Sequence, residues 1–77
     1  MARHAVILFF STNYAIWASD ELKRAGIPFK MIPVPRHLSS DCGACLRVEK
    51  ADTGRVEALL KAQSIDYDRC EDLPASQ

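Results

Sequence analysis

The feature that most restricts the fold is an uninterrupted apolar run near the N-terminus, residues 4–10, with the sequence HAVILFF. The run is far shorter than the ~20 residues that a membrane-spanning helix needs. It is typical of a strand that is buried in a sheet and flanked by other strands. A chain of 77 residues has material for one small hydrophobic core. We therefore expect residues 4–10 to form a central strand of a single domain.

A helix is predicted directly after this strand. Ser11, Thr12 and Asn13 are residue types that cap helix N-termini. Gly26 and Pro28 then end the helix, because glycine adopts a left-handed C-cap and proline cannot continue the hydrogen-bonding pattern. Between these limits, apolar residues recur at three- and four-residue spacing, as on the buried face of a helix. This stripe consists of Tyr14, Ala15, Ala18, Leu22 and Ala25.

The rest of the chain predicts three more strands and a second helix. Residues 29–34 form an edge strand, because Pro33 has no N–H to donate to a neighbour. Residues 45–50 alternate between apolar and charged side chains, as a half-buried strand does, and residues 65–70 form the last strand. The second helix starts after a cap at Asp52 or Thr53, buries Val56, Leu59, Leu60 and Gln63, and leaves Arg55, Glu57 and Lys61 in solvent.

The resulting order β-α-β-β-α-β predicts an α+β fold, the ferredoxin-like sandwich of a four-stranded antiparallel sheet with two helices on one face. Strands one and three are central in this arrangement, and strands two and four are edges. The domain covers residues 1–72, and residues 73–77 form a flexible C-terminal tail. The face opposite the helices is open to solvent or to a second copy in a homodimer. Ile16 and Trp17 lie outside the buried stripe, where Trp17 either packs at the helix flank or contacts a partner.

Charge and cysteine content exclude several functions. Ten basic and ten acidic residues give a formal net charge of zero, so no electrostatic attraction to nucleic acid or to an anionic membrane is expected. Three cysteines are an odd number and fit reduced thiols in the cytoplasm better than a secreted disulfide framework. No phosphate loop, nucleophile elbow or paired-carboxylate site occurs, and neither histidine has a catalytic partner at a suitable spacing. No cofactor is predicted.

The chemically informative segment is Pro33 to Leu46, which includes the loop or single helical turn predicted over residues 36–44. Cys42 follows residues that favour helix caps, so it can lie at the first turn of a short helix, where free N–H groups stabilise a thiolate. Arg36 and His37 are near in sequence and favour the thiolate, whereas Asp41 opposes it. Gly43 permits a positive φ or the close approach of a reaction partner.

Short motifs are spread along most of the chain. These motifs are Phe10-Ser11-Thr12, Ala25-Gly26-Ile27-Pro28, Pro33-Val34-Pro35-Arg36, Leu38-Ser39-Ser40 and Cys42-Gly43, ending at Leu46. The most specific part is the segment P-R-x-L-S-S-x-C-G, which packing alone would not require. In these motifs the sequence resembles the small bacterial proteins described as selenium/sulfur carrier-like.

The resemblance implies that Cys42 holds sulfur or selenium, as a persulfide or selenosulfide, for transfer between a donor and an acceptor protein. Arg36, Ser39, Ser40 and Gly43 match the surrounding motif and would shape the environment of the thiol. Any turnover would belong to a partner enzyme. The chain is therefore expected to act as a carrier or accessory protein rather than as an independent enzyme.

The second cysteine of the C-x-x-C spacing leaves other hypotheses open. Cys45 could resolve a persulfide on Cys42 into a disulfide, and the two thiols could instead form a redox pair. A zinc site would also need Cys70 and His37, but the second half of the chain has no matching pair, so no metal is predicted. A non-catalytic interaction module, with cysteines packed as small apolar residues, is the third hypothesis.

Overall fold

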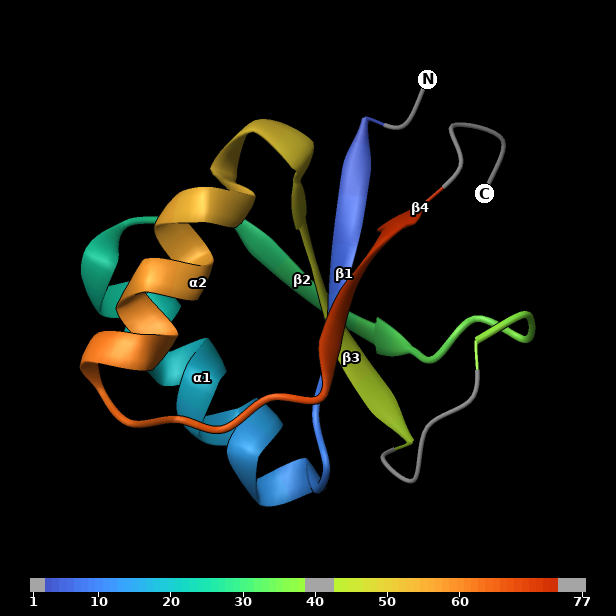
Figure 1. Cartoon of the computed structure of the whole chain (residues 1–77), viewed down its shortest axis with the longest axis horizontal. Helices are drawn as coiled ribbons and strands as arrows, with labels where there is room; N and C mark the ends of the chain where they lie inside the picture. Colours follow the sequence, from blue (N-terminus) through green and yellow to red (C-terminus); the bar gives the residue numbers. More distant parts are fainter. Residues whose placement is uncertain (1–2, 39–42, 74–77) are drawn as a thin grey trace.

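The computed structural model describes residues 3–38 and 43–73 of the chain. Its elements follow the order β-α-β-β-α-β, so the predicted α+β class and element order are confirmed (Figure 1). A short 3₁₀ helix, η1, precedes the second α-helix. The elements are β1 (His4–Leu8), α1 (Thr12–Ala25), β2 (Phe29–Pro33), β3 (Ala44–Glu49), η1 (Lys50–Asp52), α2 (Thr53–Ala62) and β4 (Arg69–Leu73).

The four strands form one antiparallel sheet in the order β2-β3-β1-β4. As predicted, β1 and β3 are central, while β2 and β4 are the edges. Both helices lie on the same side of this sheet (Figure 1). On β1, Ile7 points toward the helices, and the alternating positions Val6 and Leu8 point to the opposite face.

Helix α1 has the limits that the sequence predicts. It starts after the N-cap Ser11, and its buried residues include Ala15, Ala18 and Leu22. Gly26 has a φ of 73°, a left-handed conformation that glycine adopts without steric cost. The N–H groups of Gly26 and Ile27 donate to the carbonyls of the last helical turn, so the chain leaves α1 through a closed cap.

The last strand is the main correction to the sequence-based prediction. The strand predicted at residues 65–70 is in fact β4, which begins at Arg69 and ends at Leu73. Ile65 and Tyr67 do point toward the core, but they belong to the connection between α2 and β4. Their alternation therefore reflects packing of a loop against the core. Leu73, predicted to begin the tail, is buried and pairs with His4, whereas residues 74–77 lie outside the described residues.

The buried side chains form two clusters, one on each face of the sheet. The larger cluster lies between the sheet and the helices and includes Ile7, Leu22, Leu46 and Leu60. The smaller cluster consists of Val6, Leu8, Cys45 and Leu73, with Ile32, Val34 and Leu38 packed against it. The face predicted to be open is therefore partly covered, because the chain leaving β2 folds back over it.

The edge strand β2 carries the prolines that the sequence places there. Val34 N–H donates to the Gly43 carbonyl, which fixes the hydrogen-bonding phase of the β2–β3 pair. In this phase, the N–H groups of Phe29 and Met31 point away from β3, and Pro33 has none to offer. Lys30 lies between them on the same strand. The outer rim of β2 consequently presents few backbone donors.

Candidate functional site

The candidate site lies in the connection between β2 and β3. A backbone hydrogen bond joins the two ends of this connection. The Val34 N–H donates to the Gly43 carbonyl at 3.4 Å, and Leu38 N–H donates to the Pro35 carbonyl at 3.0 Å to form a turn. Ser39, Ser40 and Cys42, which were predicted to be part of the site, lie outside the described residues. The predicted loop character of residues 36–38 is confirmed by the turn.

This connection lies at the end of the sheet where β1 passes into α1. Leu8, the last residue of β1, pairs with Cys45, so the chain beyond Leu8 continues past the start of β3. Figure 1 shows the β1–α1 connection and the start of β3 at this same end of the molecule. Phe10 lies in that connection with 56% of its surface exposed. The motif residues Phe10-Ser11 and Gly43 thus come from distant parts of the sequence to one end of the sheet.

Three described residues close to residues 39–42 are exposed: Arg36, His37 and Gly43. Arg36 and His37 form the turn after Pro35, and both side chains face solvent. Gly43 is also exposed, its φ is not positive, and a Cβ added there would meet no atom within 4 Å. Of the two uses expected of a glycine here, a positive φ or the close approach of a partner, the conformation of Gly43 does not use the first. The surroundings leave open space at this position, which agrees with the close approach of a partner.

Cys45 lies on the face of β3 that also carries Arg47 and Glu49, as its register predicts, but it is completely buried. Its Sγ is 4.0 Å from the Pro33 carbonyl oxygen. Ile32, Val34 and Leu38 pack against the cluster that contains it. A thiol in this position is shielded from partner proteins unless the cover moves.

Cys70 lies on the other face of the sheet, against the larger cluster between the sheet and the helices, here called the helix-side cluster. Burial raises the pKa of its thiol, and the negative charges of Glu57 and Asp72 raise it further. At neutral pH this cysteine therefore stays in the thiol form, which is the less nucleophilic form. Because Cys45 and Cys70 lie on opposite faces, they cannot bind one zinc ion, so the zinc hypothesis fails.

Glu57, which the sequence predicts to face solvent, has a partner that the sequence does not reveal. Tyr67 Oη donates a hydrogen bond of 2.6 Å to the Glu57 carboxylate. This hydrogen bond, together with burial and the Glu57 charge, raises the pKa of Tyr67 to about 12. The contact joins α2 to the connection before β4. No periodic pattern marks it, because the two residues meet only after the connection folds across the helix.

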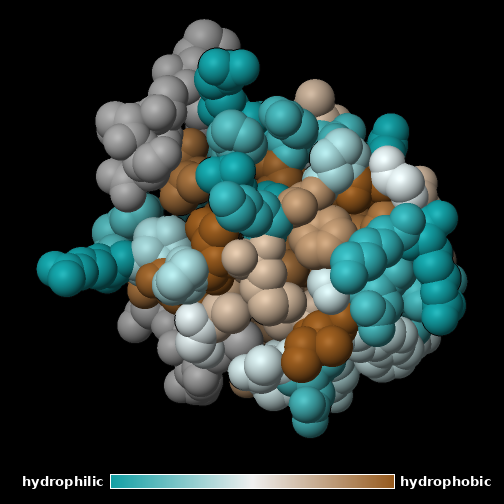
Figure 2. Space-filling model, turned by 180° about the vertical axis from the view of Figure 1, so that it is seen from behind, coloured by the Kyte–Doolittle hydropathy of each residue, from teal (hydrophilic) through white to brown (hydrophobic). Residues whose placement is uncertain are grey.

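Several large apolar side chains remain exposed. Ile16 and Trp17 are 49% and 43% exposed, which confirms that they lie outside the core, and Met31 is exposed on β2. Seen from behind, the molecule has apolar surface near its centre, with hydrophilic side chains around it (Figure 2). Apolar surface of this kind is available for contacts with another protein.

Among residues 3–38 and 43–73, no group of three or more histidine, cysteine, aspartate or glutamate side chains is arranged to hold a metal ion. None of the helices in this part of the chain is long and apolar enough to cross a membrane.

Fold and sequence together define a small α+β domain with a cysteine motif in the connection between β2 and β3. The family model described as "Putative Se/S carrier protein-like" matches residues 4–70. The chain therefore belongs to this family, as the motifs in its sequence indicated. No curated protein and no solved structure matches the chain.

Proposed function

We propose that this protein carries sulfur or selenium on Cys42, as a persulfide or selenosulfide, between a donor and an acceptor protein. The family match over residues 4–70 carries the proposal, since it names selenium and sulfur as the cargo class. Cys42 is assigned because it belongs to the P-R-x-L-S-S-x-C-G segment and stands directly before the exposed Gly43. Arg36, Ser39 and Ser40 would shape its environment.

The environments of the other two cysteines support this assignment. Cys45 is buried beneath the chain that leaves β2, and Cys70 is held as a thiol by its raised pKa. A carrier needs a thiolate that partner proteins can reach. Neither Cys45 nor Cys70 meets both requirements, which supports the assignment of Cys42.

The transfer conserves atoms and electrons. The Cys42 thiolate attacks the outer sulfur of a donor persulfide, so a new S–S bond forms on Cys42. The S–S bond of the donor breaks at the same time, and the donor cysteine leaves as a thiolate. Handing the sulfur on repeats the step, with a nucleophile of the acceptor attacking and Cys42 leaving. A selenium atom in the outer position follows the same balance, and no cofactor takes part.

Partners would recognise exposed apolar surface of this chain. Ile16, Trp17 and Phe10 offer exposed apolar area for a donor or an acceptor. We place the transfer in the cytoplasm, where thiols stay reduced. A homodimer through the face opposite the helices stays a prediction. Its contact area would have to include the residues that cover the smaller cluster.

The test is intact-mass analysis and cysteine-peptide mapping after incubation with a cysteine desulfurase and cysteine. We expect one added sulfur atom on Cys42 in the wild type and none in Cys42→Ser. The matched controls Cys45→Ala and Cys70→Ser should load normally. Loading of Cys42→Ser at the wild-type level would overturn the proposal.

The same experiment separates the alternatives. A Cys42–Cys45 disulfide without an adduct would favour the redox pair, which the C-x-x-C spacing suggests. That result would also require the cover over Cys45 to open. Complete absence of modification would favour an interaction module with structural cysteines.

A further inference from the structure

A second site is suggested by two cations that face each other in the sheet. Lys30 of β2 pairs directly with Arg47 of β3. The pair belongs to the same hydrogen-bonding phase as Val34 and Gly43, so both side chains leave the same face of the sheet, with Cβ atoms about 5 Å apart. Like charges placed directly opposite one another on neighbouring strands destabilise a sheet.

Neither cation is compensated in the part of the chain that the structure describes. Lys30 and Arg47 make no ion pair and no side-chain hydrogen bond there. Arg69, on the same face but at the β4 edge of the sheet, is by contrast paired with acidic groups. Its guanidinium is 3.1 Å from Glu71 and 2.7 Å from Asp68. A half-buried arginine beside a lysine without a counterion leaves positive charge for a ligand.

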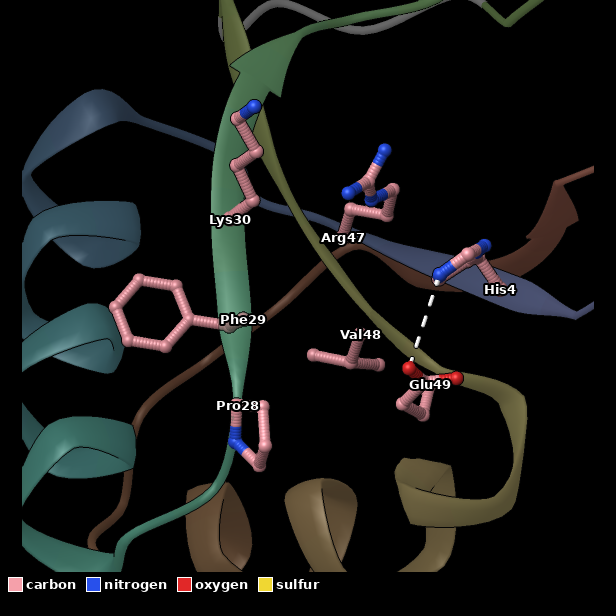
Figure 3. A pocket seen from close by; sticks show the side chains of 7 residues that line it. All are labelled: His4, Pro28, Phe29, Lys30, Arg47, Val48 and Glu49. Carbon is pink, nitrogen blue, oxygen red and sulfur yellow. Dashed lines mark ion pairs between the residues drawn. The ribbon is translucent and has the colours of Figure 1, made fainter.

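These two side chains line a shallow pocket of about 230 Å³, together with His4 and Glu49 (Figure 3). In the close view, the Arg47 guanidinium lies between the Lys30 and His4 side chains, while Phe29 points away toward the helices. The volume exceeds the ~30 Å³ that one water molecule takes in the liquid. The pocket therefore has room for a small anion and part of its hydration shell.

The other charged groups of the pocket restrict the choice of anion. Glu49 lies on the same face of β3 and repels anions, but its carboxylate is 3.9 Å from His4 Nε2. The two positive charges of Lys30 and Arg47 outweigh the single negative charge of Glu49. A carboxylate brings one negative charge to two cations. A phosphate group brings up to two and can accept hydrogen bonds from a lysine and an arginine at once.

We infer that the pocket formed by Lys30, Arg47 and His4 binds a phosphate group, either as free inorganic phosphate or as a phosphomonoester. The site lies at the end of the sheet away from Gly43, because Lys30 and Arg47 are three register steps from Pro33 and Ala44. The phosphate site is thus separate from the proposed carrier site, and its proposal does not depend on the carrier function.

The test is a titration of the full chain with inorganic phosphate at pH 8 and constant ionic strength, followed by ¹H–¹⁵N spectra and by the thermal midpoint. In the wild type, phosphate should shift the amides of Lys30, Arg47 and His4 in a saturable way and raise the Tm. Lys30→Gln and Arg47→Gln should each weaken phosphate binding about tenfold. Lys23→Gln, which removes the same charge from α1, should bind as the wild type does.

The variants also provide a readout that a purely structural role would not give. Without phosphate, Lys30→Gln should melt about 2–4 °C higher than the wild type, because the repulsion across the strands is removed. With phosphate present, the Tm difference between Lys30→Gln and the wild type should become smaller, or the wild type should melt at the higher temperature. A variant that is more stable alone but gains less from phosphate cannot be explained by misfolding.

Comparison ligands then identify the source of the phosphate group. Tighter binding of phosphoserine than of inorganic phosphate would identify a phosphomonoester, and equal or weaker binding would identify free phosphate. Acetate that binds as tightly as phosphate would overturn the assignment and indicate a carboxylate ligand. Unsaturable amide shifts, or equal dissociation constants for the wild type and Lys30→Gln, would overturn the site itself.

Discussion

The two faces of the sheet are both buried at the centre, but they are covered by different kinds of structure. Among the described residues, eleven buried side chains form the cluster under α1 and α2, and only four form the cluster on the opposite face. Two regular helices cover the first, whereas the turn after β2 contributes to the cover of the second. Local opening is easiest where few apolar contacts hold a segment. The fold therefore draws its stability mainly from one face and keeps the turn after β2 beside the other.

The largest expected effect compares two leucines of the central strands, Leu46 and Leu8, each fully buried on its own face. We expect Leu46→Ala to lower the free energy of unfolding by about 3–4 kcal/mol, because helices fixed at both ends cannot close the cavity. Leu8→Ala should cost about 2 kcal/mol, since the turn over it can collapse inward. Urea unfolding measures both values. Equal losses would show that the two covers are equally rigid.

A smaller effect concerns the hydrogen bond between Tyr67 and Glu57 on the helix-covered side. Tyr67→Phe should cost about 1.5 kcal/mol at neutral pH, because the acceptor is charged. Tyr14→Phe is the matched control. Tyr14 also packs beside the helix-side cluster, and no hydrogen bond of its side chain occurs among the described residues, so a loss below about 0.5 kcal/mol is expected.

The pH dependence of the same bond has a defined sign. The pKa of Tyr67 is about 12 in the folded state and 10 in the unfolded state, so the folded state keeps the proton to a higher pH. The stabilisation from Tyr67 is thus fully present below pH 10 and is lost as the pH rises from 10 to 12. Chemical denaturation across this interval should show a fall in the wild type that Tyr67→Phe lacks. A parallel fall in both proteins would contradict the assignment.

The smallest effect on stability is expected for a residue that covers the smaller cluster, on the face opposite the helices. Leu38 is only half-buried, so Leu38→Ala should cost less than about 1 kcal/mol. It should nevertheless speed the alkylation of Cys45, because Leu38 packs against the cluster that shields this thiol. Mass spectrometry of a variant that keeps Cys45 and lacks the other cysteines measures the rate.

Leu59→Ala is the control for this experiment, because Leu59 packs on the helix side. It should lower stability but leave the alkylation of Cys45 slow under native conditions. If Leu59→Ala exposes Cys45 as strongly as Leu38→Ala does, labelling reports global unfolding, and the two covers do not open independently.

Features that depend on neighbouring residues were predictable from the sequence. Helix α1 could be placed from Ser11 to Gly26, because both limits are local signals: Ser11 is the N-cap, although its side chain makes no capping hydrogen bond, and Gly26 closes the last turn. The central position of β1 followed from its apolar run, and the edge position of β2 from its prolines. In each case the local pattern has one structural solution.

Features that depend on distant contacts were not predictable in the same way. The alternation of Ile65 and Tyr67 is the same for an edge strand and for a connection packed on the core, and only pairing with β1 separates the two. The cover over Cys45 needs the turn at Pro35, and the facing of Lys30 and Arg47 needs the exact strand register. The candidate Cys42 was found from local sequence features, namely the cap-forming residues before it, the C-x-x-C spacing and the family motif.

The prolines of β2 have a consequence for the behaviour of the protein in concentrated solution. A formal net charge of zero means that copies of the chain do not repel one another by overall charge. Protection against strand-to-strand growth into fibrils must then come from the sheet edge itself. With Pro33 lacking an N–H and Lys30 placed between the two outward donors, β2 is a poor template for an incoming strand. A chain without net charge is in this way protected against strand-to-strand association at its β2 edge.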